Sequence, residues 1–194
     1  MTTEPVDLAA WLRVAADSIE AFPIPGEVPG SLEGFVLDHG RAYESAPFTD
    51  DERLIVANAI SAYRALRRTF APRQCFANSQ GLVANDPAKK LVYVEGFAWT
   101  HSLRPVLHGW ASLNGKVVDV TLPPTNLRET KLIEPVQILG EFKGRTYMGV
   151  PFLRSYVDRR RKVTGGHGTL LDDEDNDYPL LRLGPKGAVS RRAK

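Results

Sequence analysis

The dipeptide Asn114-Gly115 constrains the fold of this chain more than any other feature of its sequence. It is the strongest short-range sequence indication of a β-hairpin with a two-residue turn, because the favoured turn needs positive φ at both positions. Segments rich in β-branched and aromatic residues, 91–94 and 106–121, lie before and around it. The middle of the chain is therefore predicted to form an antiparallel sheet.

The two-residue turn also fixes which residues of the hairpin lie opposite one another. Leu113 faces Lys116, and stepping backward pairs Trp110 with Asp119. His108 and Asp119 are then diagonal neighbours on one face, with backbones about 7–8 Å apart, a gap that their side chains can close. The other face is nearly all apolar and is predicted to pack into the main core, with Leu107, Ala111, Leu113, Val118, Val120 and Leu122.

The predicted pairing of His108 with Asp119 has a chemical consequence. A carboxylate that accepts a hydrogen bond from one ring nitrogen fixes the tautomer, so the other nitrogen is free to take a proton from a thiol. The chain has one thiol, Cys75, at the predicted start of a helix after the break at Pro72. The helix dipole and the free amides there favour a thiolate and an oxyanion. Nothing in the hairpin register brings Cys75 within reach of His108.

Three short segments resemble the transglutaminase-like core of the papain-like cysteine protease superfamily over residues 74–122. They are Gln74-Cys75-Phe76 at a helix start, His108-Gly109-Trp110 on a strand, and Val118-Asp119-Val120-Thr121 on the next. The resemblance implies that Cys75 is the nucleophile, His108 the base and then the acid, and Asp119 the orienting residue. It also implies that the Cys75 amide is one oxyanion donor.

The function expected from this resemblance is that of a cysteine hydrolase, such as a thiol protease or amidase, or of an acyltransferase. It would cleave an amide or ester bond of a peptide, protein or small amide through a thioester, without a cofactor. The alternative is a non-catalytic binding or inhibitory protein that uses the same fold and cleft. A lone cysteine is, in general, more often a small buried hydrophobe than a nucleophile.

Four further residues are candidates for substrate binding or the oxyanion hole, and each has a structural interpretation beside the functional one. Gln74 is an oxyanion candidate only because it adjoins Cys75. Asn78 bonds a catalytic group or lies on the helix surface, and Glu95 contacts a substrate amine or points to solvent. Trp110 packs in the sheet or forms a substrate wall. His101 is an alternative base without an acid of fixed register.

The rest of the chain predicts helices before the sheet. Apolar residues at helical spacing predict helices over 7–22 and from Ser31, and Thr49 and Glu52 form a capping box for a helix to about Arg68. We therefore expect one α+β domain over 1–163, with N-terminal helices on a small antiparallel sheet and the Cys75 helix over the His108 and Asp119 face. Residues 164–194 are expected to form a mobile tail, with Leu180, Leu181 and Leu183 as possible anchors.

Composition and charge limit the kinds of partner that the protein is expected to bind. Twenty-five basic and 23 acidic residues leave a net charge of +2, so nucleic-acid binding through the basic run 159–162 is disfavoured. The acidic run 172–177 lacks the glycine and glutamate of a calcium loop, and no metal site is predicted. The N-terminal stretch lacks the pattern of a secretory signal, and no segment has the apolar length of a membrane span. We expect a cytoplasmic protein.

Overall fold

The computed structural model describes residues 7–21, 30–66, 68–100, 104–121, 145–165 and 168–189. Its helices and strands follow one another in the order α1 (Leu8–Ala21), α2 (Leu32–His39), β1 (Arg41–Tyr43), α3 (Asp50–Ala65), α4 (Cys75–Ala84), β2 (Val92–Thr100), β3 (Val106–Leu113), β4 (Lys116–Val118), β5 (Arg145–Phe152), α5 (Arg154–Thr164) and α6 (Pro179–Leu183). The predicted combination of helices with an antiparallel sheet is confirmed. The weakly patterned segment 133–139 and the ends of the chain lie outside the described residues.

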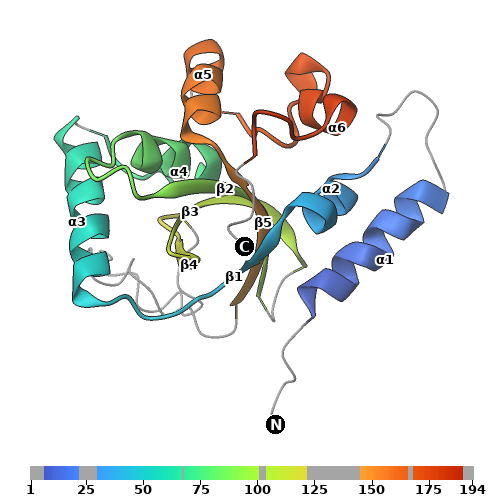
Figure 1. Ribbon diagram of the computed structural model, residues 1–194, viewed down its shortest axis with the longest axis horizontal. Helices are drawn as coiled ribbons and strands as arrows, with labels where there is room; N and C mark the ends of the chain where they lie inside the picture. The colour runs from blue at the N-terminus through green and yellow to red at the C-terminus, as the bar shows by residue number, and fades with distance from the viewer. Residues whose placement is uncertain are drawn as a thin grey trace, which may run out of the picture.

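The sheet has the strand order β1-β5-β2-β3-β4, and every neighbouring pair is antiparallel. It curls strongly, and the helices lie around the outside of the curl, with α3 and α4 at one end and α1 and α2 at the other (Figure 1). No helix in the described part of the chain is long and apolar enough to cross a membrane.

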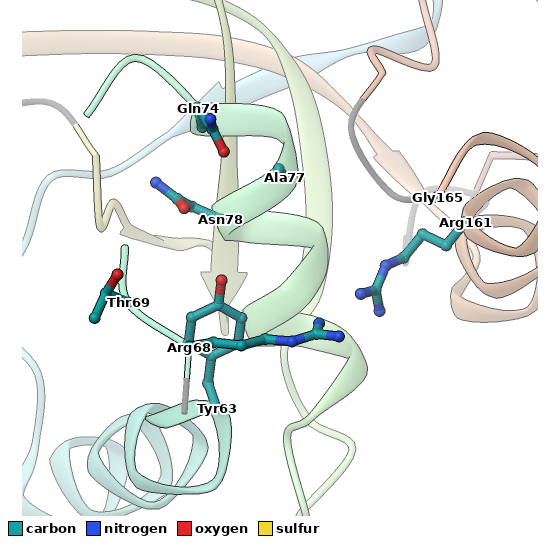
Figure 2. Close-up of a pocket in the computed structure, with 8 residues that line it drawn as sticks. All are labelled: Tyr63, Arg68, Thr69, Gln74, Ala77, Asn78, Arg161 and Gly165. Carbon is teal, nitrogen blue, oxygen red and sulfur yellow. The ribbon is translucent and has the colours of Figure 1, made fainter. Parts of the chain in front are cut away.

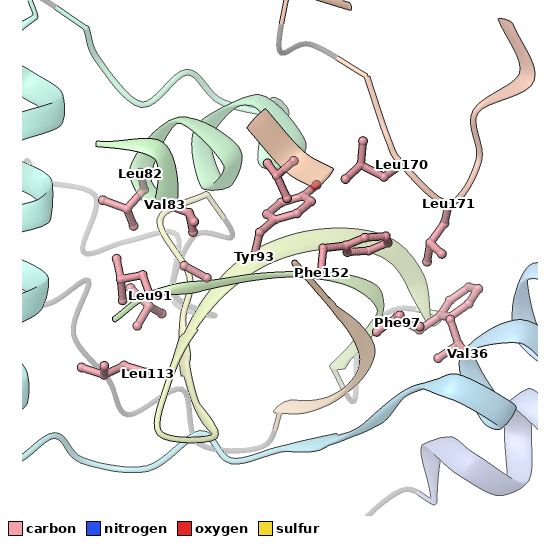
Figure 3. Close-up of a cluster of buried hydrophobic side chains, with 14 of the residues drawn as sticks. Val36, Leu82, Val83, Leu91, Tyr93, Phe97, Leu113, Phe152, Leu170 and Leu171 are labelled. Atoms are coloured by element: carbon pink, nitrogen blue, oxygen red, sulfur yellow. The ribbon is translucent and has the colours of Figure 1, made fainter. Parts of the chain in front are cut away.

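The two faces of the sheet carry different clusters of apolar residues. On one face, Tyr93, Phe97 and Phe152 pack with buried residues of the helices and of the C-terminal segment, including Val36, Leu82 and Leu171 (Figure 3). On the opposite face a smaller cluster fills the curl, formed by Tyr43, Val94, Ala98, Trp110, Val117 and Tyr147. Side chains of a strand alternate between the faces, so neighbouring apolar residues of one strand, such as Tyr93 and Val94, belong to different clusters.

The hairpin has the predicted turn and register. Leu113 pairs with Lys116 and Ala111 with Val118, while Asn114 and Gly115 have φ values of 53° and 84°. Ala111, Leu113 and Val118 belong to the main core, as expected, and Leu107 and Val120 pack against it. Leu122 lies outside the described residues.

The position of α4 differs from the prediction. Its first turn packs on Gly109, and its Leu82 and Val83 join the main-core cluster with Tyr93. The helix therefore covers the face opposite to the one that carries His108 and Trp110. The prediction assumed that the cysteine helix had to cover the face of its partners, but the helix buries its own apolar side chains, and these fit only the apolar face of the sheet.

The segment predicted to be a mobile tail is packed against the domain over residues 168–189. Leu170, Leu171, Leu180 and Ala188 are buried in the main core, whereas the expected anchor Leu183 is 82% exposed. Within the acidic run, Asp173 is buried and forms an ion pair with Arg160 of α5. The sequence pattern underestimated this segment because most of its few apolar residues pack against a surface that only the folded sheet provides.

Candidate active site

Cys75 occupies the first position of α4, and the chain before it makes an abrupt turn. Arg73 adopts a positive φ of 62°, and Gln74, the N-cap residue, makes no side-chain capping bond. Cys75 is partly exposed, and its side chain lies near enough to His108 to raise the pKa of the imidazole. The structure thus brings together the two residues that the hairpin register left apart.

His108 lies near the start of β3 and contacts Asp119 just beyond the end of β4. Its ring nitrogen Nε2 is 2.8 Å from Oδ2 of Asp119, which leaves Nδ1 for the Cys75 thiol. The diagonal placement expected from the Asn114-Gly115 turn therefore positions this pair. Both residues are buried, with 3% and 1% of their surface exposed, so water competes little for the contact.

Two further groups hold the Asp119 carboxylate. The backbone N–H of Thr121 donates to Oδ1 at 2.9 Å, and the hydroxyl of Tyr147 on β5 donates to Oδ2 at 3.1 Å. Burial and the neighbouring Asp119 charge raise the pKa of Tyr147 well above its usual value, so the hydroxyl keeps its proton and acts as a donor. Asp119 is thereby fixed in the orientation that receives His108.

Electrostatics favour a protonated His108. Burial alone would lower its pKa, but the charge and hydrogen bond of Asp119, followed by those of Cys75, outweigh burial and raise the pKa from 6.5 to about 9. With a pKa of about 9 the imidazole is a cation at neutral pH. A group in this state can donate a proton to a leaving group.

Gly109 explains how α4 comes close enough for the cysteine to reach His108. A Cβ atom at Gly109 would lie 2.8 Å from Cδ1 and 3.2 Å from Cα of Phe76, the residue after Cys75. Ser79, one turn further along α4, donates a hydrogen bond of 2.9 Å to the Gly109 carbonyl. Since β4 pairs with β3 only at residues 111–113, the edge of β3 beside His108 is open to the start of α4.

Trp110 packs beneath the site. It is completely buried, its ring stacks on His108 with centroids 6.2 Å apart, and Tyr43 and Tyr147 meet it edge-on. Of the two interpretations of Trp110, the structure therefore favours packing over a substrate wall.

Asn78 holds the backbone around the cysteine. Its side chain exchanges hydrogen bonds of 3.1 and 2.8 Å with the N–H and C=O of Ala71, and its amide donates to the Thr121 hydroxyl at 2.9 Å. It thus connects the turn that precedes α4 with the residue that orients Asp119. Gln74 and Asn78 both line a cavity beside α4 (Figure 2).

Glu95 has a role that differs from both of its predicted interpretations. It is completely buried on the main-core face, where it accepts hydrogen bonds from Tyr93, Thr169 and the N–H groups of Leu170 and Leu171. Burial raises its pKa, although these hydrogen bonds oppose the shift. The donors come from the C-terminal segment, so the sequence pattern of β2 could not indicate them.

Sequence reasoning missed several residues that support the triad. They include Tyr147 on β5, which donates to Asp119, and Ser79 on α4, which donates to the Gly109 carbonyl. The adjacency of Gly109 to His108 was a usable indication, because a glycine inside a strand often marks a close approach of another backbone. The alternative base His101 lies outside the described residues.

The described residues were searched for a metal site, and the chain was compared with known proteins. In the part of the chain that the structure describes, no group of three or more His, Cys, Asp or Glu residues could hold a metal ion. Comparison of the chain with protein-family models, with curated proteins and with solved structures finds no match.

Proposed function

We propose that the protein is a cysteine hydrolase or acyltransferase in which Cys75 is the nucleophile, His108 the acid and base, and Asp119 the orienting residue. The observation that carries the proposal is that the Cys75 side chain acts on the pKa of His108, whose Nε2 lies 2.8 Å from Oδ2 of Asp119. A nucleophile bonded to a base, itself oriented by a third group, is the arrangement by which nucleophilic catalysis is identified.

The proposed resting state is an ion pair of a Cys75 thiolate with the His108 imidazolium. The raised His108 pKa of about 9 supports it, since an imidazolium beside the sulfur favours the thiolate over the thiol. Asp119 holds the Nε2–H through the 2.8 Å contact and so directs Nδ1 at the sulfur. The partial exposure of Cys75 gives a substrate access to the sulfur.

The reaction follows from these roles. The thiolate attacks the carbonyl carbon of an amide or ester, and the resulting oxyanion is stabilised by the Cys75 N–H at the start of α4. Expulsion of the amine or alcohol takes the proton from His108 and leaves a thioester on Cys75. Water or an amine then attacks the thioester, His108 accepts its proton, and the acyl product leaves with regeneration of the thiolate–imidazolium pair. Gln74 is the proposed second oxyanion donor because its side chain makes no capping bond.

The fold proposed for this site is a transglutaminase-like core of the papain-like superfamily. Three features support it: a cysteine at the first position of a helix, a histidine on a central strand and an aspartate next to the following strand, in that chain order. The antiparallel sheet that joins β2, β3 and β5 accommodates these positions. Peptides, proteins and small amides are the substrate classes that this core implies.

The experiment that tests the proposal uses p-nitrophenyl acetate as a generic acyl donor. Release of nitrophenolate and acetylation of Cys75, followed by intact-protein mass spectrometry, are expected for the wild-type protein. Cys75→Ala should abolish both, and His108→Ala should slow acylation by about 10²–10⁴-fold. His39→Ala is the matched control, because His39 packs on Phe35 in α2, outside the triad.

A second measurement separates transfer from hydrolysis and the enzyme from its alternative. Hydroxylamine added to the acetylated protein should yield acetohydroxamate when the thioester accepts amines. Alkylation of Cys75 by iodoacetamide should persist near pH 6 in the wild-type protein and be lost in His108→Ala. A thiol that is inert below pH 8, together with no acetylation, would overturn the proposal in favour of a non-catalytic binding protein.

A further inference from the structure

A cavity of about 340 Å³ lies beside α4. It is formed between the end of α3, the start of α4 and the end of α5, and its lining includes Gln74 and Asn78 but not Cys75 (Figure 2). Its size falls within the range of small-molecule sites. No residue of the triad is among the described residues that line it, although Gln74 adjoins Cys75 in the chain.

Two arginines give the cavity its charge. Arg68 follows α3 and Arg161 lies in the last turns of α5, and their guanidinium groups extend into the same space from opposite walls (Figure 2). Burial lowers the pKa of Arg161, and the charge of Arg68 lowers it further, while Asp158 and Tyr63 oppose the shift. Two like charges thus face one another, which is unfavourable unless a counter-charge is present.

The described residues do not supply this counter-charge by direct contact. No carboxylate lines the cavity, and neither Arg68 nor Arg161 forms an ion pair with a described acidic residue. The Nε atom of Arg161 is inaccessible and has no hydrogen-bond partner among those residues. By contrast, the adjacent Arg160 forms an ion pair with Asp173. The lack of an ion pair at Arg161 is therefore not shared by its neighbour on α5.

Neutral side chains line other parts of the cavity. Gln74 on α4 and Thr69 on the loop before it are among the lining residues, and Figure 2 shows them away from the two guanidinium groups. The Asn78 amide, also part of the lining, is already engaged by Ala71 and Thr121. The two guanidinium forks alone match the several acceptor oxygens of a phosphate or carboxylate group.

We propose that this cavity is a binding site for a small anionic ligand with a phosphate or carboxylate group, which Arg68 and Arg161 hold from opposite sides. The bound anion neutralises the two facing guanidinium groups. The site does not depend on catalysis by Cys75, so its test is a binding measurement.

The test is isothermal titration of the purified chain with inorganic phosphate and, separately, with malonate, at constant ionic strength. Saturable binding of at least one anion at a single site is expected, and the preferred anion identifies the ligand class. Arg161→Gln and Arg68→Gln should each weaken binding by about tenfold or more, because each removes charge-assisted hydrogen bonds. Arg13→Gln is the matched control, since this exposed arginine of α1 lies outside the cavity.

A second variant keeps the test decisive if loss of an arginine disturbs folding. Thr69→Glu places a carboxylate at an exposed position on the cavity wall and should suppress anion binding by competition, while far-UV circular dichroism stays that of the wild type. The proposal is overturned if neither anion binds saturably, or if Arg13→Gln weakens binding as much as Arg161→Gln does. The latter result would show general attraction to positive charge.

Discussion

Two opposing effects determine the pKa of His108. Its nearly complete burial disfavours a charged ring, whereas the Asp119 carboxylate at 2.8 Å and the Cys75 side chain favour one. The second effect is larger, and the pKa rises to about 9. The protonation of His108 near neutral pH therefore depends on Asp119, which contacts no substrate in the proposed mechanism and acts through the imidazole.

The first prediction concerns the pH dependence of stability. Because the folded pKa of His108 is above its unfolded value of 6.5, its contribution is complete below pH 6.5 and is lost as the pH rises through about 9. Asp119→Asn lowers the pKa of His108 and should remove most of this dependence, which amounts to up to about 3 kcal/mol. Urea unfolding at intervals from pH 6 to 10 measures it.

The control for this measurement is His39→Ala, which removes a histidine outside the triad and should keep the wild-type pH profile. Parallel profiles for wild type and Asp119→Asn between pH 6.5 and 9 would contradict the stated role of Asp119. An NMR titration of the His108 ring supplies an independent readout, with a lower pKa expected in Asp119→Asn.

At the scale of secondary-structure elements, the contact between α4 and β3 assembles the site. The helix carries the thiol and covers one face of the sheet, while His108 belongs to the other face. The two meet only because the backbone of α4 approaches β3 at Gly109, next to His108 and opposite Phe76. The absence of a side chain at Gly109 therefore determines how closely the start of α4 can approach His108.

The second prediction tests this close approach. Gly109→Ala adds a methyl group 2.8 Å from the Phe76 ring and should displace the first turn of α4. We expect a loss of about 1–3 kcal/mol in unfolding free energy and, at pH 6, slower alkylation of Cys75. Gly168→Ala is the matched control, because a Cβ there meets no atom within 4 Å. Unchanged alkylation in Gly109→Ala would show that the contact does not set the Cys75–His108 distance.

The hairpin and α3 are connected through Glu52. Its carboxylate completes the capping box with the Thr49 N–H and also receives Asn114 at 3.0 Å and Lys116 at 2.7 Å. Hydrogen bonds from Lys116, Asn114 and Thr49 lower the pKa of Glu52 to about 2. The turn that sets the register of His108 and Asp119 is therefore attached to the N-terminus of a helix.

The third prediction follows from this attachment. Glu52→Ala should lower the unfolding free energy by about 1 kcal/mol, because the capping box and the bonds to the turn are lost. Since the folded pKa is depressed, the Glu52 contribution is present above pH 4.5 and is lost as the pH falls through about 2. Urea unfolding should show the deficit of Glu52→Ala shrinking from pH 5 to pH 3. Asp51→Ala, an exposed acid in the same turn, should show a smaller deficit.

At the scale of the whole molecule, the C-terminal segment completes the core. Thr169, Leu170 and Leu171 donate to Glu95, which lies in the second strand and is completely buried. Gln80 of α4 donates to the Gly168 carbonyl and to the Tyr93 hydroxyl, so the cysteine helix, the sheet and the segment share one polar network. A buried network of this kind is favourable only while its members are satisfied.

The fourth prediction is that Glu95 holds this segment in place. Glu95→Gln replaces an acceptor oxygen by an N–H₂ group among four donors and should cost roughly 1–3 kcal/mol of unfolding free energy. Hydrogen exchange at the Leu170 and Leu171 amides should accelerate more than exchange in β2 and β3. Glu174→Gln, an exposed acid of the same segment, is expected to leave exchange unchanged. Equal acceleration over the whole sheet would indicate general destabilisation instead.

The sequence by itself determined the local features of this protein. The Asn114-Gly115 turn sets the register that joins His108 to Asp119, and the capping box sets the start of α3. These features depend on residues that are close in sequence or joined by one tight turn, where backbone conformation and strand alternation decide the result. The start of a helix at Cys75 belongs to the same group.

Only the tertiary structure decided what brings these features together. The contact of Cys75 with His108, the burial of Glu95 by residues 168–171, the attachment of Asn114 to Glu52 and the opposition of Arg68 to Arg161 all join segments that are distant in sequence. Such contacts depend on how apolar faces pack and on which backbone groups then need partners, and no periodic pattern in one segment records the partner in another.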